Sequence, residues 1–427
     1  MNLSKKLVAA GIAALALFGS TGIAFADAPG AGSGADGLPD LVIGGGSDTT
    51  YYAMQKLEGL YNLDPGCAVD TSSSANQGKC LVSQASDVAT NGNYDHDIMV
   101  SNYPTGSGVG LGALTSTGFQ YSSGNIDYAR SSRALKAGIE QNELQAWGYA
   151  RDGIAIVSLG GLTENLSVQQ IHDIYTCSIT DWHTIDAVLP VGSTITPWGM
   201  QTSSGTYATF RDFIRANATV TGGGALDTAF DPNAGGGVTP NCVKQLQIGT
   251  PAVATLPFEN DTKPLLDPVK NGGVAAAGGI WWGSAGEFNT FAFKRGAGTT
   301  ILQVGGFLPN SATISANTYP ILRTLWHVTR KTDAIDVAPV APATAHTVGW
   351  GTFVSTGVYT ANSTANGGKP GAVREFTKFL CKTNLQQATD PFTGVNFRTE
   401  VTGALAASGF VQVPSALRTA GLMCTIG

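Results

Sequence analysis

Two turns rich in glycine, serine and threonine precede predicted helices in this sequence. The first covers residues 46–51 and the second covers residues 203–206. The first turn of a helix exposes backbone N–H groups and carries a partial positive charge, so it can bind an anion. Serine and threonine hydroxyls add donors, although the same residues also serve as ordinary helix caps. Taken together, the two turns favour an oxyanion site over two unrelated caps.

A strand, a turn and a helix recur in that order along the chain. Short apolar runs at residues 41–43, 154–157 and 194–198 predict strands, and Ser167 with Gln170 forms a capping-box pattern before one of the helices. Apolar residues at helical spacing identify four helices: Met54, Leu57 and Leu60; Val168, Ile171 and Ile174; Tyr207, Phe210 and Ile214; Val373, Phe376 and Phe379. This alternation predicts an α/β protein whose sheets are covered by helices.

The N-terminal residues have the pattern of an export signal. Two lysines precede an apolar run at residues 7–18, and Ala24-Phe25-Ala26 supplies a small-x-small cleavage site. We expect residues 1–26 to be a signal peptide cleaved near Ala26, followed by a flexible, glycine-rich leader at residues 27–37. No cysteine lies beside the cleavage site, so we expect a secreted, extracellular protein without a lipid anchor.

The chain has six cysteines, an even number, and the export signal places them in an oxidising compartment. Six cysteines allow fifteen pairings, but three disulfides between neighbours along the chain are the simplest set. We predict these pairs: Cys67 with Cys80, Cys177 with Cys242, and Cys381 with Cys424. Neither the cysteines nor the histidines have the spacing of a zinc site, so we predict no metal and no cofactor.

Charge is sparse in this chain. Charged residues make up 13% of the sequence and the net charge is −6, without a basic stripe. Proteins that bind nucleic acid usually carry such a stripe, so we expect no nucleic-acid partner. A small anion is still a possible ligand, because an acidic protein can hold a cleft that is locally rich in donors.

Several segments resemble, in the same order, those of the periplasmic phosphate-binding proteins of bacterial uptake systems. Ser204-Gly205-Thr206 before an aromatic-rich helix is similar to the Ser-Gly-Thr phosphate loop of that family. Further similar segments are residues 44–52, 102–112, 126–133, 166–185, 278–288 and 319–328. The resemblance covers most of residues 38–380.

The resemblance implies a type 2 periplasmic-binding-protein fold, with two α/β lobes, a hinge and an interlobe cleft. Residues 38–150 and 325–427 would form lobe 1, and residues 151–324 would form lobe 2. The implied function is capture of a small oxyanion, phosphate first, by a monomer that works with an ABC-type permease and catalyses nothing. The implied ligand residues are Thr49, Thr50, Tyr51, Ser107, Gly108, Arg130, Ser131, Ser132, Ser203, Ser204, Gly205 and Thr206.

Two family charges are missing from this chain. Ser132 stands where the family has an aspartate that accepts the proton of hydrogen phosphate, and Met200 stands where it has an arginine. Arg130 or Arg133 could replace the guanidinium, and Asp48 could accept a proton. Hydrogen bonds from neutral donors are about half as strong as charge-assisted ones, so we expect weaker affinity or altered specificity.

Three alternative functions are weighed against oxyanion capture. The first is a secreted surface or interaction protein that keeps the binding fold without the ligand. A hydrolase is disfavoured because the chain has no G-x-S-x-G motif. A sugar binder could use Tyr51-Tyr52 or Trp281-Trp282 for stacking, although buried aromatic pairs are commoner.

Overall fold

The computed structural model describes the central part of the chain and separate segments on either side of it. The described residues are 42–63, 98–115, 126, 128–331, 346–348, 351–353, 359–361, 373, 376–377, 379–381, 383 and 395–427. The predicted signal peptide, the leader and the predicted pair Cys67–Cys80 lie outside these residues.

One mixed sheet of ten strands dominates the described residues. Its main path runs in the order β2-β1-β3-β12-β4-β9-β6, and β10, β16 and β17 also pair with β4. The strands are β1 Val42–Gly46, β2 Ile98–Thr105, β3 Tyr128–Ser131, β4 Leu144–Ser158, β6 Thr196–Pro197, β9 Gly279–Ser284, β10 Thr300–Ile301, β12 Leu322–Arg330, β16 Val411–Gln412 and β17 Thr425–Ile426. Parallel pairing of β1 with both β2 and β3 places the carboxyl ends of these strands at one edge.

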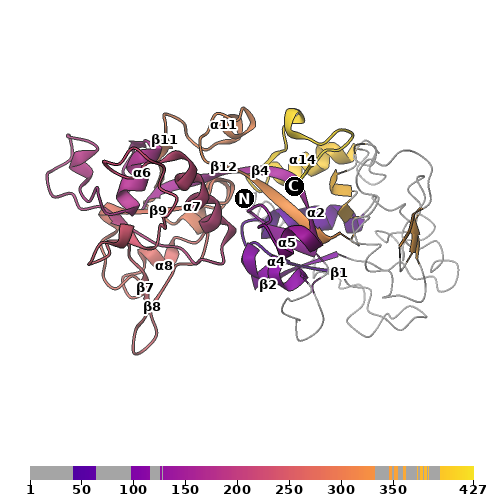
Figure 1. Ribbon diagram of the computed structural model, residues 1–427, viewed down its shortest axis with the longest axis horizontal. Helices are drawn as coiled ribbons and strands as arrows, with labels where there is room; N and C mark the ends of the chain where they lie inside the picture. Colours follow the sequence, from indigo (N-terminus) through magenta and orange to yellow (C-terminus); the bar gives the residue numbers. More distant parts are fainter. Residues whose placement is uncertain are drawn as a thin grey trace, which may run out of the picture.

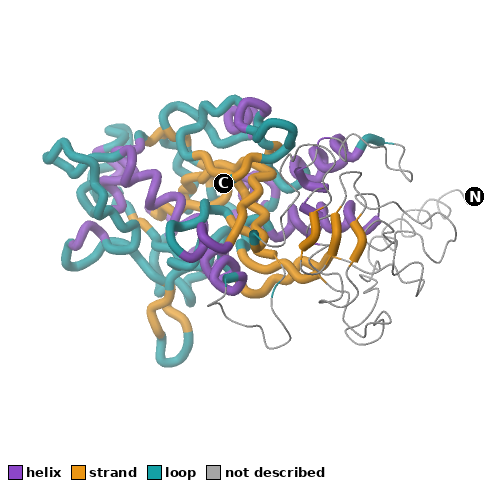
Figure 2. Tube along the Cα trace, turned by 45° about the vertical axis from the view of Figure 1, so that its right-hand side comes forward, coloured by secondary structure: helices purple, strands orange, loops and turns teal. Residues whose placement is uncertain are grey.

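Smaller strands and short helices complete the described structure. The remaining strands are β5 Asn165–Leu166, β7 Leu246–Ile248, β8 Val253–Thr255, β11 Gln303–Val304, β13 His346–Val348, β14 Gly351–Phe353 and β15 Tyr359–Ala361. The helices are α2 Tyr51–Leu63, α4 Ser107–Leu114, α5 Ile139–Glu143, α6 Val168–Tyr175, α7 Gly205–Asn217, α8 Lys263–Leu266, α9 Ala285–Thr290, α10 Ala292–Arg295, α11 Ser311–Ser315 and α14 Phe397–Ala406. Figure 2 shows the β7–β8 hairpin extending away from the body of the molecule.

The buried apolar residues form separate cores on the two sides of the molecule. One core draws its buried members from residues 154–321. Two others draw theirs from residues outside that range, towards both ends of the chain. We call the first part the middle lobe and the second the terminal lobe. Figure 1 shows β4 and β12 running from one lobe to the other, so these paired strands form the hinge. The residue limits predicted for the lobes stay a prediction.

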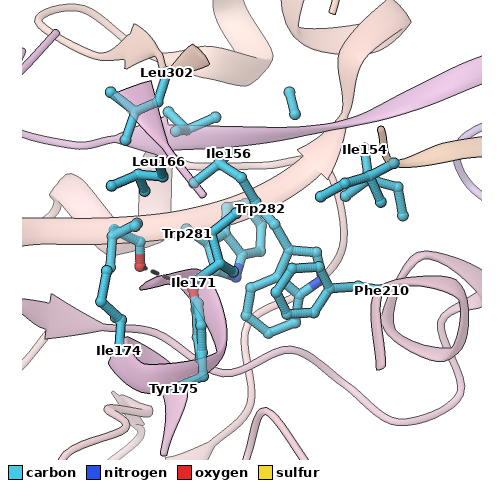
Figure 3. Packing of buried hydrophobic residues seen from close by; sticks show 14 of the residues in the cluster. Ile154, Ile156, Leu166, Ile171, Ile174, Tyr175, Phe210, Trp281, Trp282 and Leu302 are labelled. Atoms are coloured by element: carbon cyan, nitrogen blue, oxygen red, sulfur yellow. Dashed lines mark hydrogen bonds between the residues drawn. The ribbon is translucent and has the colours of Figure 1, made fainter. Parts of the chain in front are cut away.

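Aromatic packing in the middle lobe fixes helix α7 against the sheet (Figure 3). Trp282 stacks on Phe210 of α7 with ring centroids 4.5 Å apart, and Tyr175 of α6 meets Trp282 edge-on at 4.9 Å. Trp281 and Trp282 are both fully buried. A sugar therefore cannot stack on this tryptophan pair, which instead holds the helix that opens with the Ser-Gly-Thr turn.

Most of the local predictions are confirmed. The capping box of Ser167 and Gln170 opens α6, and the apolar run at 154–157 lies within the longer strand β4. The strand expected at residues 194–198 is shorter, since β6 spans only Thr196–Pro197. Pro197 has no N–H for a sheet ladder, which limits the strand at this point.

Two of the three predicted disulfides are confirmed. Cys177 is bonded to Cys242, and Cys381 is bonded to Cys424, with Cα atoms 5.8 Å and 5.0 Å apart. The first bond belongs to the middle lobe and the second to the terminal lobe. Among the described residues, no helix is long and apolar enough to span a bilayer.

A buried histidine on β12 makes the stability of the fold depend on pH in the acidic range. His327 is fully buried against Tyr128 and Phe376, and its Nε2 lies 2.9 Å from Thr377 Oγ1. Burial lowers its pKa to about 3. The unfolded chain protonates this ring near pH 6.5 and the folded chain does not, so stability is lost as the pH falls from about 6.5 towards 3, by up to about 1.4 kcal/mol per pH unit.

We expect His327→Gln to reduce this acid sensitivity, although the variant is less stable at pH 7 because its packing is poorer. Urea unfolding between pH 7 and pH 4 measures the free energy of unfolding of both proteins. Equal losses over that range would show that His327 does not titrate on unfolding.

Candidate functional site

Three serine hydroxyls of the terminal lobe form a connected cluster. Ser47 donates to Ser132 at 3.1 Å, and the hydroxyls of Ser107 and Ser132 lie 3.2 Å apart. The N–H of Ser132 also donates to Ser107 Oγ at 3.0 Å. Ser47 follows β1, Ser107 opens α4 and Ser132 follows β3. Parallel strands therefore bring hydroxyls from three separate segments to one edge of the sheet.

The opening of α7 in the middle lobe packs directly on this serine cluster. Ser204 caps the helix, because its hydroxyl accepts the N–H groups of Thr206 and Tyr207. Gly205 is so close to the cluster that a Cβ there would overlap the hydroxyls of Ser107 and Ser132. The N–H of Gly108 donates to the carbonyl of Ser203 at 3.1 Å. The two lobes are thus closed against each other at this point.

Two threonines, one from each lobe, share a guanidinium from the hinge. The hydroxyls of Thr49 and Thr206 lie 3.3 Å apart. Arg323 of β12 donates from Nη1 to Thr206 at 2.6 Å and from Nη2 to Thr49 at 3.4 Å. Asn260 adds a bond from Nδ2 to Thr49 at 2.9 Å. Arg323 is therefore a cation that reaches hydroxyls on both sides of the lobe contact.

The charge of Arg323 is balanced within the hinge itself. Arg323 and Asp152 are direct partners in the register of β12 and β4. Nε and Nη2 of Arg323 donate to Asp152 Oδ2 at 2.9 Å and 2.7 Å. Asp152 also accepts from the hydroxyl of Ser284 and the N–H of Gly286. Both charged side chains are almost completely buried, so the pair depends on these bonds.

A carboxylate of the middle lobe lies at the openings of α2 and α7. Glu259 accepts the N–H of Asp48 at 3.1 Å with one oxygen. Its other oxygen accepts the hydroxyl of Ser204 and lies 3.5 Å from the N–H of Thr206. The donors of two helix openings, one in each lobe, therefore converge on a single carboxylate.

A second group of charges lies beside Asp48. Lys294 contacts Glu287 at 2.7 Å and Asp48 at 3.3 Å, and its Nζ lies 5.1 Å from the ring centre of Tyr52. Burial raises the pKa of Glu287 to about 8, although Lys294 opposes the shift. Burial also raises the pKa of Asp48, again against the effect of Lys294. Asp48, the expected proton acceptor, is thus held in an ion pair.

The arginines proposed from the sequence have other partners. Arg130 is fully buried and donates from Nε and Nη1 to the carbonyls of Ser47 and Gly44, at 3.3 Å and 2.9 Å. Burial lowers its pKa, and its guanidinium lies 5.5 Å from the ring centre of Tyr51. Arg133 forms an ion pair with Glu140 at 2.7 Å. Arg130 thus supports the turn after β1 in this closed form, and a role for it toward a ligand stays a prediction.

The predicted ligand residues divide into two sets. The residues at the lobe contact are Thr49, Ser107, Gly108, Ser132, Ser203, Ser204, Gly205 and Thr206. The residues that contact neighbouring segments behind it are Thr50, Tyr51, Arg130 and Ser131. Sequence reasoning missed Glu259, Asn260, Asp152 and Arg323. Only Arg323 carried a signal, because it lies in the segment 319–328 that resembles the family.

The chain belongs to the PBP superfamily. The model of the PBP superfamily domain matches residues 68–354, which is more than half of the chain. The two lobes, the mixed sheet and the two hinge strands agree with a type 2 periplasmic-binding-protein fold. The predicted fold class is therefore confirmed.

Several solved structures are similar to this chain at low identity. A putative phosphate ABC transporter substrate-binding protein with bound phosphate from Clostridium perfringens is 14% identical, covers 87% of this chain and 99% of its own, and has a TM-score of 0.46. An ancestral soluble variant of the human phosphate binding protein is 18% identical and has a TM-score of 0.49. The match covers 88% of this chain and 91% of that protein. An ABC-type phosphate transport receptor from Vibrio cholerae is 18% identical and has a TM-score of 0.38. The match covers 69% of this chain and 89% of that protein. No curated protein matches the chain.

Loss of the hinge carboxylate is expected to destabilise the protein strongly. Asp152→Asn leaves the buried guanidinium of Arg323 without a counter-charge, which costs about 3–5 kcal/mol in comparable sites. The double variant Asp152→Leu with Arg323→Met removes both charges and is expected to regain part of that loss. Unfolding in guanidinium chloride measures the free energy of unfolding of the native protein and of both variants. If the free energy of unfolding of Asp152→Asn lies within about 1 kcal/mol of that of the native protein, the explanation by a buried ion pair is wrong.

Proposed function

We propose that this protein captures a small oxyanion between its two lobes, with phosphate as the first candidate. The observation that carries the proposal is the convergence on Glu259. Donors from the openings of α2 and α7 already hold a pair of carboxylate oxygens there. An oxyanion has the same kind of acceptor oxygens, and helix openings are favourable places for them.

The ligand donors of the proposed site are mainly neutral. Hydroxyls of Ser47, Ser107 and Ser132 come from the terminal lobe, and the opening of α7 faces them. The sequence departs from the phosphate-binding pattern at Ser132 and at Met200, which is buried with its sulfur 3.4 Å from Ser204 Oγ. Arg323 supplies positive charge, but the negative charge of Asp152 balances it. This balance supports weaker binding or a different anion preference than in the family pattern.

Entry of the ligand requires the lobes to separate. The hydroxyls of Thr49 and Thr206 are in direct contact, and the N–H of Gly108 is bonded to Ser203. These contacts leave no space between the paired groups. The hinge strands β4 and β12 are the segments about which the lobes would open, as in other two-lobed binding proteins.

The cellular setting of the proposal comes from the sequence. The predicted export signal and the two disulfides support a secreted protein. A monomer that delivers its ligand to an ABC-type permease follows from the resemblance to uptake systems. The protein is proposed to catalyse nothing, which agrees with Ser204 donating its hydroxyl to a carboxylate rather than to an imidazole base.

One observation favours a second candidate, an interaction protein that has lost its ligand. Glu259 already accepts a donor from each of the two helix openings, so the lobes could stay closed without any external anion. The two candidates differ in a simple property, because only the first protein responds to added oxyanions.

Phosphate is expected to stabilise the native protein and to lose that effect when the α7 opening is changed. A ligand at one hundred times its Kd adds about 2.7 kcal/mol of stability. Ser204→Ala with Thr206→Val removes two donors and should abolish the shift in melting temperature caused by phosphate. Ser167→Ala is the matched control, because it removes an equivalent cap from α6, away from the lobe contact.

Thermal unfolding with phosphate, sulfate, arsenate and molybdate measures these effects. If phosphate shifts the melting temperature of the double variant as much as that of the native protein, the opening of α7 is not part of the site. No response of the native protein to any of these anions would favour the interaction protein instead.

A further inference from the structure

The carboxylate of Glu259 occupies the donors that an external anion would use. It accepts the N–H of Asp48 at 3.1 Å, the hydroxyl of Ser204, and the N–H of Thr206 at 3.5 Å. The residue is only 1% exposed. Glu259 therefore links the openings of α2 and α7 in the way that a bound oxyanion would.

The side chain of the next residue, Asn260, is bonded to both lobes. Asn260 donates from Nδ2 to Thr49 in the terminal lobe at 2.9 Å, and its Oδ1 accepts the N–H of Ser284 in the middle lobe at 2.7 Å. Its φ of 61° lies in the left-handed region, which asparagine tolerates better than most residues. The two bonds of Asn260 thus hold the segment between β8 and α8 in place, with the carboxylate of Glu259 at the lobe contact.

The cations around the lobe contact already have partners within the protein. Arg323, Lys294 and Arg130 are cations close to the lobe contact. Arg323 is paired with Asp152, and Lys294 with Glu287 and Asp48. Arg130 donates to the carbonyls of Ser47 and Gly44. A free oxyanion next to an ionised Glu259 would meet a like charge in a buried place and would find its donors taken.

We propose that Glu259 is an internal competitor for the anion site, which an external oxyanion must displace before it can bind. This inference rests on the proposed function. If the carboxylate holds the donors in nine molecules out of ten, the apparent Kd is about tenfold weaker than that of the vacated site. Glu259 thereby sets the affinity of the protein.

The same competition selects the class of anion. A simple carboxylate such as acetate offers two acceptor oxygens, which is what Glu259 already provides without loss of translational freedom. A tetrahedral oxyanion offers four, so it can also use the hydroxyls of Ser107 and Ser132 beside the opening of α7. Inorganic phosphate and similar tetrahedral ions are therefore the ligands that can displace Glu259, and monocarboxylates are rejected.

Isothermal titration calorimetry with inorganic phosphate tests the inference on the full secreted chain. Glu259→Gln keeps the size of the side chain and removes its charge, and we expect it to bind phosphate at least tenfold more tightly than the native protein. Glu259→Asp withdraws the carboxylate by one methylene and should also bind more tightly, by a smaller factor. Asp261→Asn is the control, because it removes one charge from the same segment at a carboxylate that accepts the N–H of Lys263, and it should bind like the native protein.

The outcomes separate this inference from the proposed function. Equal or weaker phosphate binding by folded Glu259→Gln, with binding by the native protein intact, would overturn the competitor role and leave oxyanion capture standing. Weaker phosphate binding with new sulfate binding would instead make Glu259 the acceptor of the ligand's proton. If neither the native protein nor Glu259→Gln binds phosphate, sulfate, arsenate or molybdate, while circular dichroism shows both folded, then both proposals are wrong.

Discussion

The site depends on a buried ion pair at the hinge. Arg323 and Asp152 face each other on β12 and β4, the two strands that run between the lobes. A buried charge without a partner is very costly, so breaking this pair would destabilise the protein strongly. It uses Nε and Nη2 of the guanidinium, and Nη1 is thereby turned toward Thr206. The strands that connect the lobes thus also place a cation at the lobe contact.

Around this pair the structure combines neutral donors with balanced charges. Serine and threonine hydroxyls gather at the carboxyl ends of β1 and β3 and at the opening of α7, while Arg323 and Lys294 have acidic partners and Arg130 donates to backbone carbonyls. Neutral hydrogen bonds are weaker than charge-assisted ones, but they leave no excess charge to bury when the site is empty. Glu259 completes this balance by occupying the helix openings itself. The proposed site would therefore favour a ligand with many acceptor oxygens over one with a single strong charge.

The parts of the structure that depend on neighbours in sequence could be predicted well. Caps at Ser167 and Ser204, the helices that follow them and the disulfides in both lobes were all readable, because each signal lies within a few residues or within one lobe. The hydroxyls of Ser107 and Ser132 were also correctly grouped, but only through the ordered resemblance to a family. Arg130 was the natural choice for a cation by the same reasoning, and its burial under the turn after β1 was not visible from the sequence.

The sequence by itself determined the α/β class, the helix openings rich in donors and the sparse charge of the chain. Only the tertiary structure decided which charged groups meet those openings. Glu259 contacts Asp48 across 211 positions of sequence, and Arg323 contacts Thr49 across 274. Such contacts follow from strand order and register and from the closure of the lobes, since no local pattern distinguishes a glutamate at the surface from one buried at two helix openings.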